Sequence, residues 1–211
     1  MRVYVVRKWL LRGRSRFVCW NITQVNLWLL CNVHFVQSTQ RTLLKDYTKV
    51  NVFCAISSQK VCGPFFFAEG TITGMTYLDM LQPWLMPQLQ NIQTFIFQQD
   101  GSPIHFHCEV RQYLNTVLPG RWMGRVSGND QPLMLWPPRS PDITPCEFFL
   151  WGCVKDRVFI PALHRDLADL KAWIIAAVKN IDAPMLMRVW QELQYRIDVC
   201  CVTHGAHVEH L

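Results

Sequence analysis

The sequence predicts a mixed α/β domain, and three of its features support that prediction. Hydrophobic residues make up 50% of the 211 residues and aromatic residues 12%, which is typical of a chain with a substantial buried core. Two adjacent apolar segments near residue 50 have the pattern of a β-hairpin, and helix and strand patterns alternate after them. Two amphipathic helices follow near the C-terminus. We therefore expect a sheet flanked by helices, with a C-terminal helical pair.

The first expected unit is the hairpin. Residues 50–56 alternate between apolar and smaller side chains, residues 61–67 form a second apolar run, and the four residues between them are typical of a turn. Residues 76–90 then carry apolar side chains at helical spacing. Because Pro83 and Pro87 interrupt this segment, we expect a kinked or broken helix there.

Short strands and helices are expected to alternate through the middle of the chain. Residues 94–100 form an apolar run that ends in Asp100, and a helix is expected over 108–117 because Pro and Gly close it. Residues 120–132 contain three glycines and other turn formers, which indicates a loop or insertion. Residues 133–136 are a further candidate for a buried strand.

The last third of the sequence is expected to be helical. A proline-rich segment leads into a helix near residue 146, and Thr144, Pro145 and Glu147 match a capping box in which Thr144 is the N-cap. Two further helices have single apolar stripes, one over 167–181 and one over 186–197.

The net charge of +6 comes from one end of the chain. Residues 1–45 contain eight basic groups and no acid, whereas the remaining residues contain 13 basic and 15 acidic groups. The uncharged stretch 17–40 follows six basic groups and invites a signal-anchor interpretation, but polar residues interrupt it, so we do not expect a membrane span. It fits a buried strand, or translated sequence that was never selected as protein.

Cysteines are numerous but irregularly placed. Nine cysteines without regular spacing do not predict a disulfide framework, and a reducing compartment, the cytosol or the nucleus, fits better. A zinc site near the C-terminus is not expected, because its candidate ligands match no finger spacing. These candidates are Cys200, Cys201, His204, His207 and His210.

Two carboxylates are the candidate functional residues. Asp100 ends an apolar strand, where reactive groups gather in α/β sheets, although an Asp at this place also commonly caps a turn. Glu147 follows a stiff proline-rich segment, although it also fits the capping box, and Asp142 competes with it as the acidic group of this segment. Carboxylates from separate elements suit Mg²⁺ or Mn²⁺, so the pair suggests a divalent-metal site that acts on phosphate esters.

Three segments together resemble the catalytic domain of mariner-like transposases, in the DDE/D superfamily. The segments occur in the order of that family and are VFCAIS (52–57) with GPFFF (63–67), FQQDGSPIH (97–105) and WPPRSPDITPCE (136–147). The resemblance begins near residue 50 and implies an RNase H-like fold. It also implies a phosphoryl-transfer enzyme that cuts and joins DNA with two divalent metal ions, Mg²⁺ or Mn²⁺, held by three acids.

Residue by residue, the resemblance makes Asp100 the second acid and Glu147 the third, both of them catalytic and metal-binding. Asp142 matches a preceding non-catalytic acid, and His105 matches a histidine that follows the second acid. The first acid is missing, because the strand-like segment expected to carry it offers Cys31 or Asn32 instead. The 46 residues between Asp100 and Glu147 also exceed the family's usual number.

The sequence therefore predicts a truncated or decayed transposase copy, without the family's N-terminal helix-turn-helix region. We expect it to bind DNA, by resemblance transposon ends, in the nucleus, with weakened metal binding and impaired cleavage. We also expect that the chain can pair with a second copy as a homodimer, and we expect no association with a membrane. The alternative is a non-enzymatic interaction scaffold. The expected division is a leader (1–45), the catalytic domain (46–160) and a helical extension (161–211).

Overall fold

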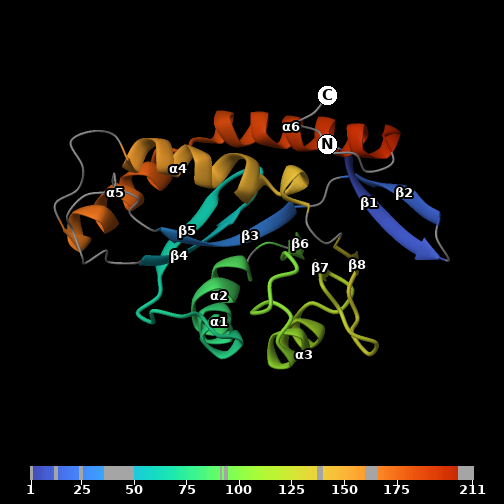
Figure 1. Ribbon diagram of the computed structural model, residues 1–211, viewed down its shortest axis with the longest axis horizontal. Helices are drawn as coiled ribbons and strands as arrows, with labels where there is room; N and C mark the ends of the chain where they lie inside the picture. The colour runs from blue at the N-terminus through green and yellow to red at the C-terminus, as the bar shows by residue number, and fades with distance from the viewer. Residues whose placement is uncertain are drawn as a thin grey trace.

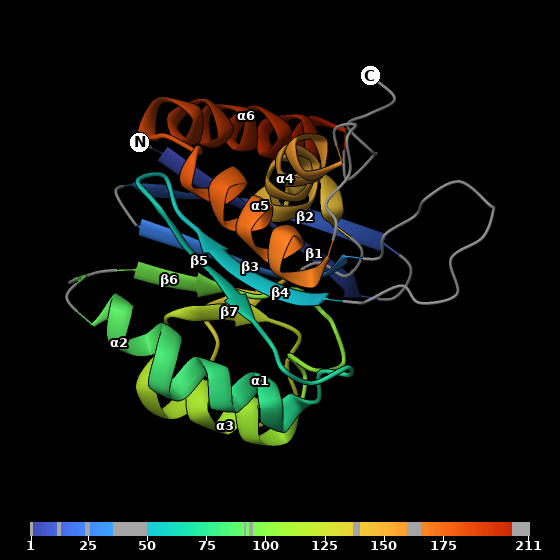
Figure 2. The same cartoon turned by 90° about the vertical axis from the view of Figure 1, so that its left-hand side faces the viewer.

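The computed structural model describes residues 2–11, 14–23, 26–35, 50–90, 92, 95–136, 140–159 and 166–203, the first three of these ranges through their backbone. The chain folds into a central sheet between two layers of helices (Figures 1 and 2). Within the described residues, no helix has both the length and the apolar composition needed to cross a membrane.

The central sheet has six strands in the order β5-β4-β3-β6-β7-β8. They are β3 (Asn26–Phe35), β4 (Val50–Ile56), β5 (Val61–Phe66), β6 (Phe95–Gln98), β7 (Trp122–Gly124) and β8 (Met134–Leu135). β3, β4 and β5 pair antiparallel, whereas β6, β7 and β8 continue parallel to β3. A separate antiparallel hairpin joins β1 (Arg2–Leu11) to β2 (Arg14–Thr23). β3 is an inner strand of the central sheet, and it comes from the segment 1–45 that the sequence analysis separated as a leader.

Helices cover both faces of this sheet (Figure 2). One face carries α1 (Gly74–Met80), the π-helical turn η1 (Leu81–Leu85), α2 (Met86–Leu89) and α3 (Cys108–Val117). The other carries the 3-10 turn η2 (Pro141–Ile143), the π-helical turn η3 (Cys146–Leu150), α4 (Trp151–Val158), α5 (Leu167–Lys179) and α6 (Ala183–Val202). The C-terminal helical pair therefore packs on the sheet instead of standing apart from it.

Strand β4 explains why the sheet is covered twice. Successive side chains of a strand point to opposite faces, and here both sets are apolar. Val52, Cys54 and Ile56 belong to the core cluster shared with α4, α5 and α6, whereas Phe53 and Ala55 belong to the cluster shared with α1 and α3. All five are at most 1% exposed, and a strand buried on both faces has an almost continuous apolar sequence.

The hairpin and the broken helix are confirmed. β4 and β5 pair antiparallel, and the predicted helix over 76–90 divides around the π-helical turn that contains Pro83. The loop prediction for 120–132 is wrong in part, because β7 lies inside it. Trp122 and Met123 are fully buried and β7 pairs with β6, but three residues are too few to show a strand period in the sequence.

Candidate active site

Asp100 lies two residues beyond the end of β6. Its Oδ1 accepts the backbone N–H of Ser102 at 2.9 Å and lies 2.5 Å from Nδ1 of His105. Burial acts to raise the pKa of this carboxyl, but the hydrogen bond and charge of His105 and the Ser102 N–H outweigh it, so the pKa is lowered. Asp100 is therefore ionised at neutral pH, and its side chain is 38% exposed.

A buried network holds His105 against Asp100. The His105 side chain is 1% exposed, and its ring lies 4.6 Å from the Tyr77 ring, centroid to centroid. Gln99 Nε2 donates to the His105 carbonyl at 3.1 Å, and the Tyr77 hydroxyl donates to Gln99 Oε1 at 3.4 Å. Because both described contacts of the Asp100 carboxylate use Oδ1, Oδ2 is the oxygen that could meet a cation.

Glu147 is the second residue of the π-helical turn η3, and it is exposed. The predicted capping box is wrong. Thr144 donates its hydroxyl to the Ser140 carbonyl at 2.8 Å instead of capping the helix, and Pro145 occupies the N-cap position. The reason is burial: Thr144 is 3% exposed, a buried hydroxyl needs a hydrogen-bond partner, and the Ser140 carbonyl provides it. Glu147 is therefore not explained by the predicted capping role.

Cys146, which precedes Glu147 in η3, is affected by both carboxylates. Cys146 is fully buried, and its pKa is raised well above the usual value, first by burial and then by the charges of Cys54, Glu147 and Asp100. The arrangement of the elements agrees with this: η3, which carries Glu147, contacts β3, and β3 pairs with β6, the strand that leads to Asp100. The fold therefore brings η3 and the end of β6 to the same strand, although 46 residues separate Asp100 and Glu147 in sequence.

Asp142 lies elsewhere. Its charge acts on Cys200 of α6, whose pKa is raised first by burial and then by Asp142. Its backbone carbonyl accepts Arg196 Nη1 of the same helix at 3.2 Å. The turn that carries Asp142 thus packs against the C-terminal half of α6.

Comparison with known proteins identifies the fold. No protein-family model matches the chain. Over 142 residues it is 27% identical to the Tc3 transposase of Caenorhabditis elegans, which covers 66% of this chain but 39% of that protein. The Mos1 transposase catalytic domain, solved with raltegravir and Mn, superposes with a TM-score of 0.62 at 16% identity over 85% of this chain and 83% of that one. The fold is that of a mariner transposase catalytic domain.

Larger mariner assemblies agree. The Mos1 paired-end complex with the left transposon end gives a TM-score of 0.64 at 16% identity, over 87% of this chain and 56% of that one. The resemblance to mariner-like transposases and the mixed α/β, RNase H-like fold predicted from the sequence are thereby confirmed. The chain spans about two fifths of the curated Tc3 relative, 39% of its length.

The sheet register locates the missing first acid of the mariner pattern. Cys31 of β3 is paired with Cys54 of β4, and Leu29 of β3 is paired with Gln98 of β6. Position 31 lies two residues after Leu29 on the same face of β3, and Asp100 follows two residues after Gln98, beyond the end of β6. Position 31 therefore belongs to the row of residues on this sheet face that leads toward Asp100. Asn32, by contrast, is paired with Phe53, which belongs to the other core cluster. Of the two candidates, position 31 therefore occupies the row of the candidate site.

These residues fit a divalent ion incompletely. Asp100 and Glu147 supply hard oxygen donors, but the row of position 31 contains thiols, which suit Mg²⁺ poorly. Cys54 and Cys146 are fully buried, and burial raises the pKa of both thiols, so neither readily supplies a thiolate. Among the described residues, no group of three His, Cys, Asp or Glu side chains could hold a metal ion.

Two further residues near Asp100 escaped the sequence analysis. Gln98 is fully buried, and its amide nitrogen and oxygen have no hydrogen-bond partner among the residues that the structure describes. It is the last residue of β6, two residues before Asp100. The exposed Arg125 stacks 4.2 Å from the centre of the Phe106 ring, and its Cβ lies 4.0 Å from where a side chain on Gly101 would begin. Arg125 was not singled out from the sequence, because it falls within the predicted loop 120–132.

The remaining candidates do not join this site. Arg157 donates to the Ala177 carbonyl at 3.0 Å, so it links α4 to α5. Cys54 is buried and Cys153 is half-buried against the same core. Cys201 is disulfide-bonded and Cys200 is a free thiol. The three histidines of the C-terminal cluster lie outside the described residues.

Proposed function

We propose that this chain is a DNA-binding protein derived from a mariner-like transposase, and that its DNA cleavage and strand transfer are impaired. The fold and the Tc3 similarity support the derivation. One observation carries the site assignment: η3, which carries Glu147, contacts β3, and β3 pairs with the strand that leads to Asp100. The impairment follows from position 31, where a cysteine stands in the row of Asp100.

Asp100 and Glu147 are the residues that would hold Mg²⁺ or Mn²⁺. Related Mos1 catalytic domains were solved with each of these metals. When bound, such an ion would polarise a phosphodiester oxygen and lower the barrier to its displacement. His105 would keep the Asp100 carboxylate ionised and fixed through Oδ1. Without a third carboxylate, the site would bind the metal weakly and catalyse poorly.

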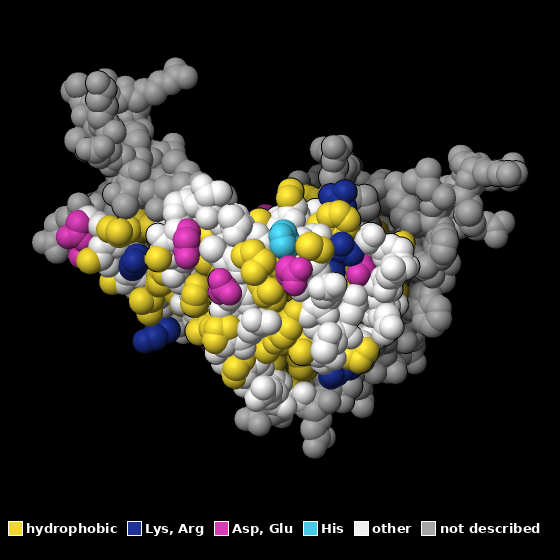
Figure 3. Space-filling model, turned by 90° about the horizontal axis from the view of Figure 1, so that it is seen from below, with side chains coloured by type: hydrophobic (Ala, Val, Ile, Leu, Met, Phe, Trp, Pro, Cys, Tyr) yellow, Lys and Arg dark blue, Asp and Glu magenta, His cyan; other side chains and the backbone are white. Residues whose placement is uncertain are grey.

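DNA is the partner that the related Mos1 complexes suggest, since they include complexes with transposon ends and a strand-transfer complex. The face that carries α1 and α3 shows acidic and basic side chains scattered among apolar ones (Figure 3). Binding would therefore depend on individual cations such as Arg125 beside Asp100, not on a uniformly basic face. A protein with this function acts in the nucleus, and DNA retention that weakens with rising salt is the expected result.

Restoring the missing acid tests the impairment. Cys31→Asp is expected to raise Mn²⁺-dependent nicking of a supercoiled plasmid by about a hundredfold, because metal stabilisation of a transition state is worth several kcal/mol. A third carboxylate beside Asp100 and Glu147 should lower the melting temperature in EDTA, because like charges repel. Mn²⁺ should reverse that loss by binding the folded state.

Asn32→Asp is the matched control, because it adds the same charge one residue away in the row of Phe53. It should give neither nicking nor stabilisation by Mn²⁺. Equal effects of both substitutions would contradict the assignment of position 31. Robust cleavage by the unaltered chain, abolished by Asp100→Ala, would contradict the impairment itself.

The scaffold alternative is favoured by one feature of α6. Met187, Tyr195 and Val202 lie within one side of this helix and are 59%, 58% and 79% exposed. Large apolar side chains grouped on a surface are typical of protein interfaces. A chain that self-associates in sedimentation experiments, and that shows no salt-dependent retention on DNA, would support a scaffold instead of a DNA-binding protein.

A further inference from the structure

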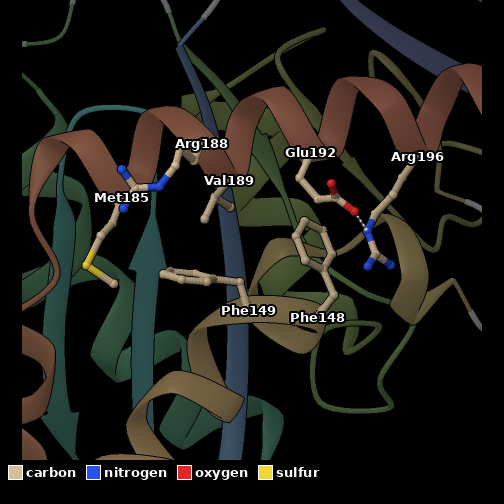
Figure 4. Close-up of a pocket in the computed structure, with 7 residues that line it drawn as sticks. All are labelled: Phe148, Phe149, Met185, Arg188, Val189, Glu192 and Arg196. Carbon is tan, nitrogen blue, oxygen red and sulfur yellow. Dashed lines mark hydrogen bonds and ion pairs between the residues drawn. The ribbon is translucent and has the colours of Figure 1, made fainter. Parts of the chain in front are cut away.

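A hollow of about 380 Å³ opens between α6 and the π-helical turn η3 (Figure 4). Side chains from these two elements line it, and they are Phe148, Phe149, Met185, Arg188, Val189, Glu192 and Arg196. Small-molecule sites occupy about 300–1,000 Å³, so this volume is near their lower end. No residue assigned above to metal binding lines the hollow.

The lining combines an apolar floor with charged walls. Phe148, Phe149, Met185 and Val189 supply the apolar surface. The three charged residues all come from α6 at intervals of four residues, so they follow one side of that helix above the phenylalanines (Figure 4).

Two of the three charges neutralise each other. Arg196 Nε lies 2.7 Å from Glu192 Oε1, and the Arg196 guanidinium stacks 4.4 Å from the centre of the Phe148 ring. This Arg196 is only 16% exposed, and it also donates to the Asp142 carbonyl, so it forms a fixed wall.

Arg188 supplies the remaining charge. It is exposed, and it has no ion pair or hydrogen bond with the residues that the structure describes. The hollow therefore carries a net positive charge beside a partly exposed aromatic ring, Phe149.

We propose that the hollow binds one unstacked nucleotide of a DNA strand, with its base against Phe149 and Met185 and its phosphate on Arg188. Aromatic rings beside cations are the usual means of holding single-stranded DNA, and stacking tolerates any base. A duplex keeps its bases stacked inside the helix and cannot place one there without opening. Phe148 and Phe149 directly follow Glu147 in η3, so the hollow lies beside this carboxylate of the candidate active site.

This inference rests on the proposed DNA binding, and the test separates the two. The full chain is titrated with a single-stranded oligodeoxynucleotide containing 2-aminopurine, and with the blunt duplex of the same sequence. Arg188→Ala and Phe149→Leu are each expected to weaken single-strand binding by about tenfold. They should change duplex binding by less than about twofold, and should abolish the change in 2-aminopurine fluorescence that unstacking produces.

Lys179→Ala is the matched control, since it removes an exposed cation from the last turn of α5 that does not line the hollow. It should leave the difference between single strand and duplex unchanged. Circular dichroism melting excludes unfolding of Phe149→Leu, and the exposed Arg188 provides a second variant that does not depend on the core.

Three results would overturn the inference. Unchanged single-strand binding in both variants would show that the hollow holds no nucleotide. Equal losses of affinity for single strand and duplex would show that Arg188 contributes only a general electrostatic attraction to DNA. A fall in affinity for an apolar peptide, with DNA binding unchanged, would assign the hollow to protein. Failure of the unaltered chain to bind either DNA would instead refute the proposed function.

Discussion

The ion pair between Arg111 and Asp130 holds the segment after β7 against α3. Removing either partner should lower the stability of the fold. Arg111 Nη1 lies 2.6 Å from Asp130 Oδ2, and the same carboxylate accepts Asn115 Nδ2 at 3.0 Å and the Ser127 N–H at 2.5 Å. Burial acts to raise the pKa of Asp130, but these hydrogen bonds and the Arg111 charge outweigh it and lower the pKa. The two side chains are 14% and 6% exposed, so water scarcely replaces the pair.

The expected magnitude follows from this burial. Breaking a buried pair by removing one partner costs about 3–5 kcal/mol, because the other charge stays buried. Arg111 keeps two contacts, a hydrogen bond to the Phe106 carbonyl at 3.0 Å and stacking 4.6 Å from the centre of its ring. We therefore expect Asp130→Ala to lower the free energy of unfolding by about 3 kcal/mol, at the lower end of that range. A domain of this size would then melt about 6–12 °C lower.

The assay is urea unfolding of Asp130→Ala and of the four proteins of a double-mutant cycle: the unaltered chain, Asp130→Leu, Arg111→Met and the double variant. Removing both charges together should cost about 0–1 kcal/mol, so the coupling energy should be about 2 kcal/mol or more. Asp156→Ala removes an exposed acid from α4 and should change stability by less than about 0.5 kcal/mol. Additive single effects, or a loss below about 1 kcal/mol for Asp130→Ala, would refute the reasoning.

Four further predictions concern two glycines, His105 and the pH dependence of Asp130. Gly74→Ala should destabilise by about 1–3 kcal/mol in urea unfolding, since its Cβ would collide with the N-cap residue of α3. Gly152→Ala, which meets nothing within 4 Å inside α4, should instead stabilise by about 0.5–1 kcal/mol. His105→Ala should raise the pKa of Asp100 in a ¹³C-carboxyl NMR titration, and an unchanged pKa would disprove the role of the imidazole. Because the folded-state pKa of Asp130 is lowered, its stabilisation is complete above the unfolded value of about 4 and is lost as pH falls through the folded value. The free energy of unfolding of Asp130→Asn, measured in urea, should accordingly change less between about pH 5 and pH 3 than that of the unaltered chain.

The sequence predicted long or strongly patterned elements well. β4 and β5 were predictable because an apolar strand pair bounded by turn residues has few other structures. Two helices, α5 and α6, were predictable because one apolar stripe runs through each of them. β7 was missed, since a strand of three residues is defined by its pairing with β6 and not by any pattern of its own. The capping box failed because burial decided the partner of the Thr144 hydroxyl.

The sequence by itself determined the residue types of the candidate site, its resemblance to mariner-like transposases and the absence of a first acid from the expected strand. It left Cys31 and Asn32 as equal candidates, and it left Asp142 competing with Glu147. Only the tertiary structure separates them, because strand pairing places position 31 on the sheet face that leads toward Asp100, whereas Asp142 is hydrogen-bonded through its carbonyl to Arg196 of α6. Register and packing arise from contacts between distant segments, and no local pattern encodes such contacts.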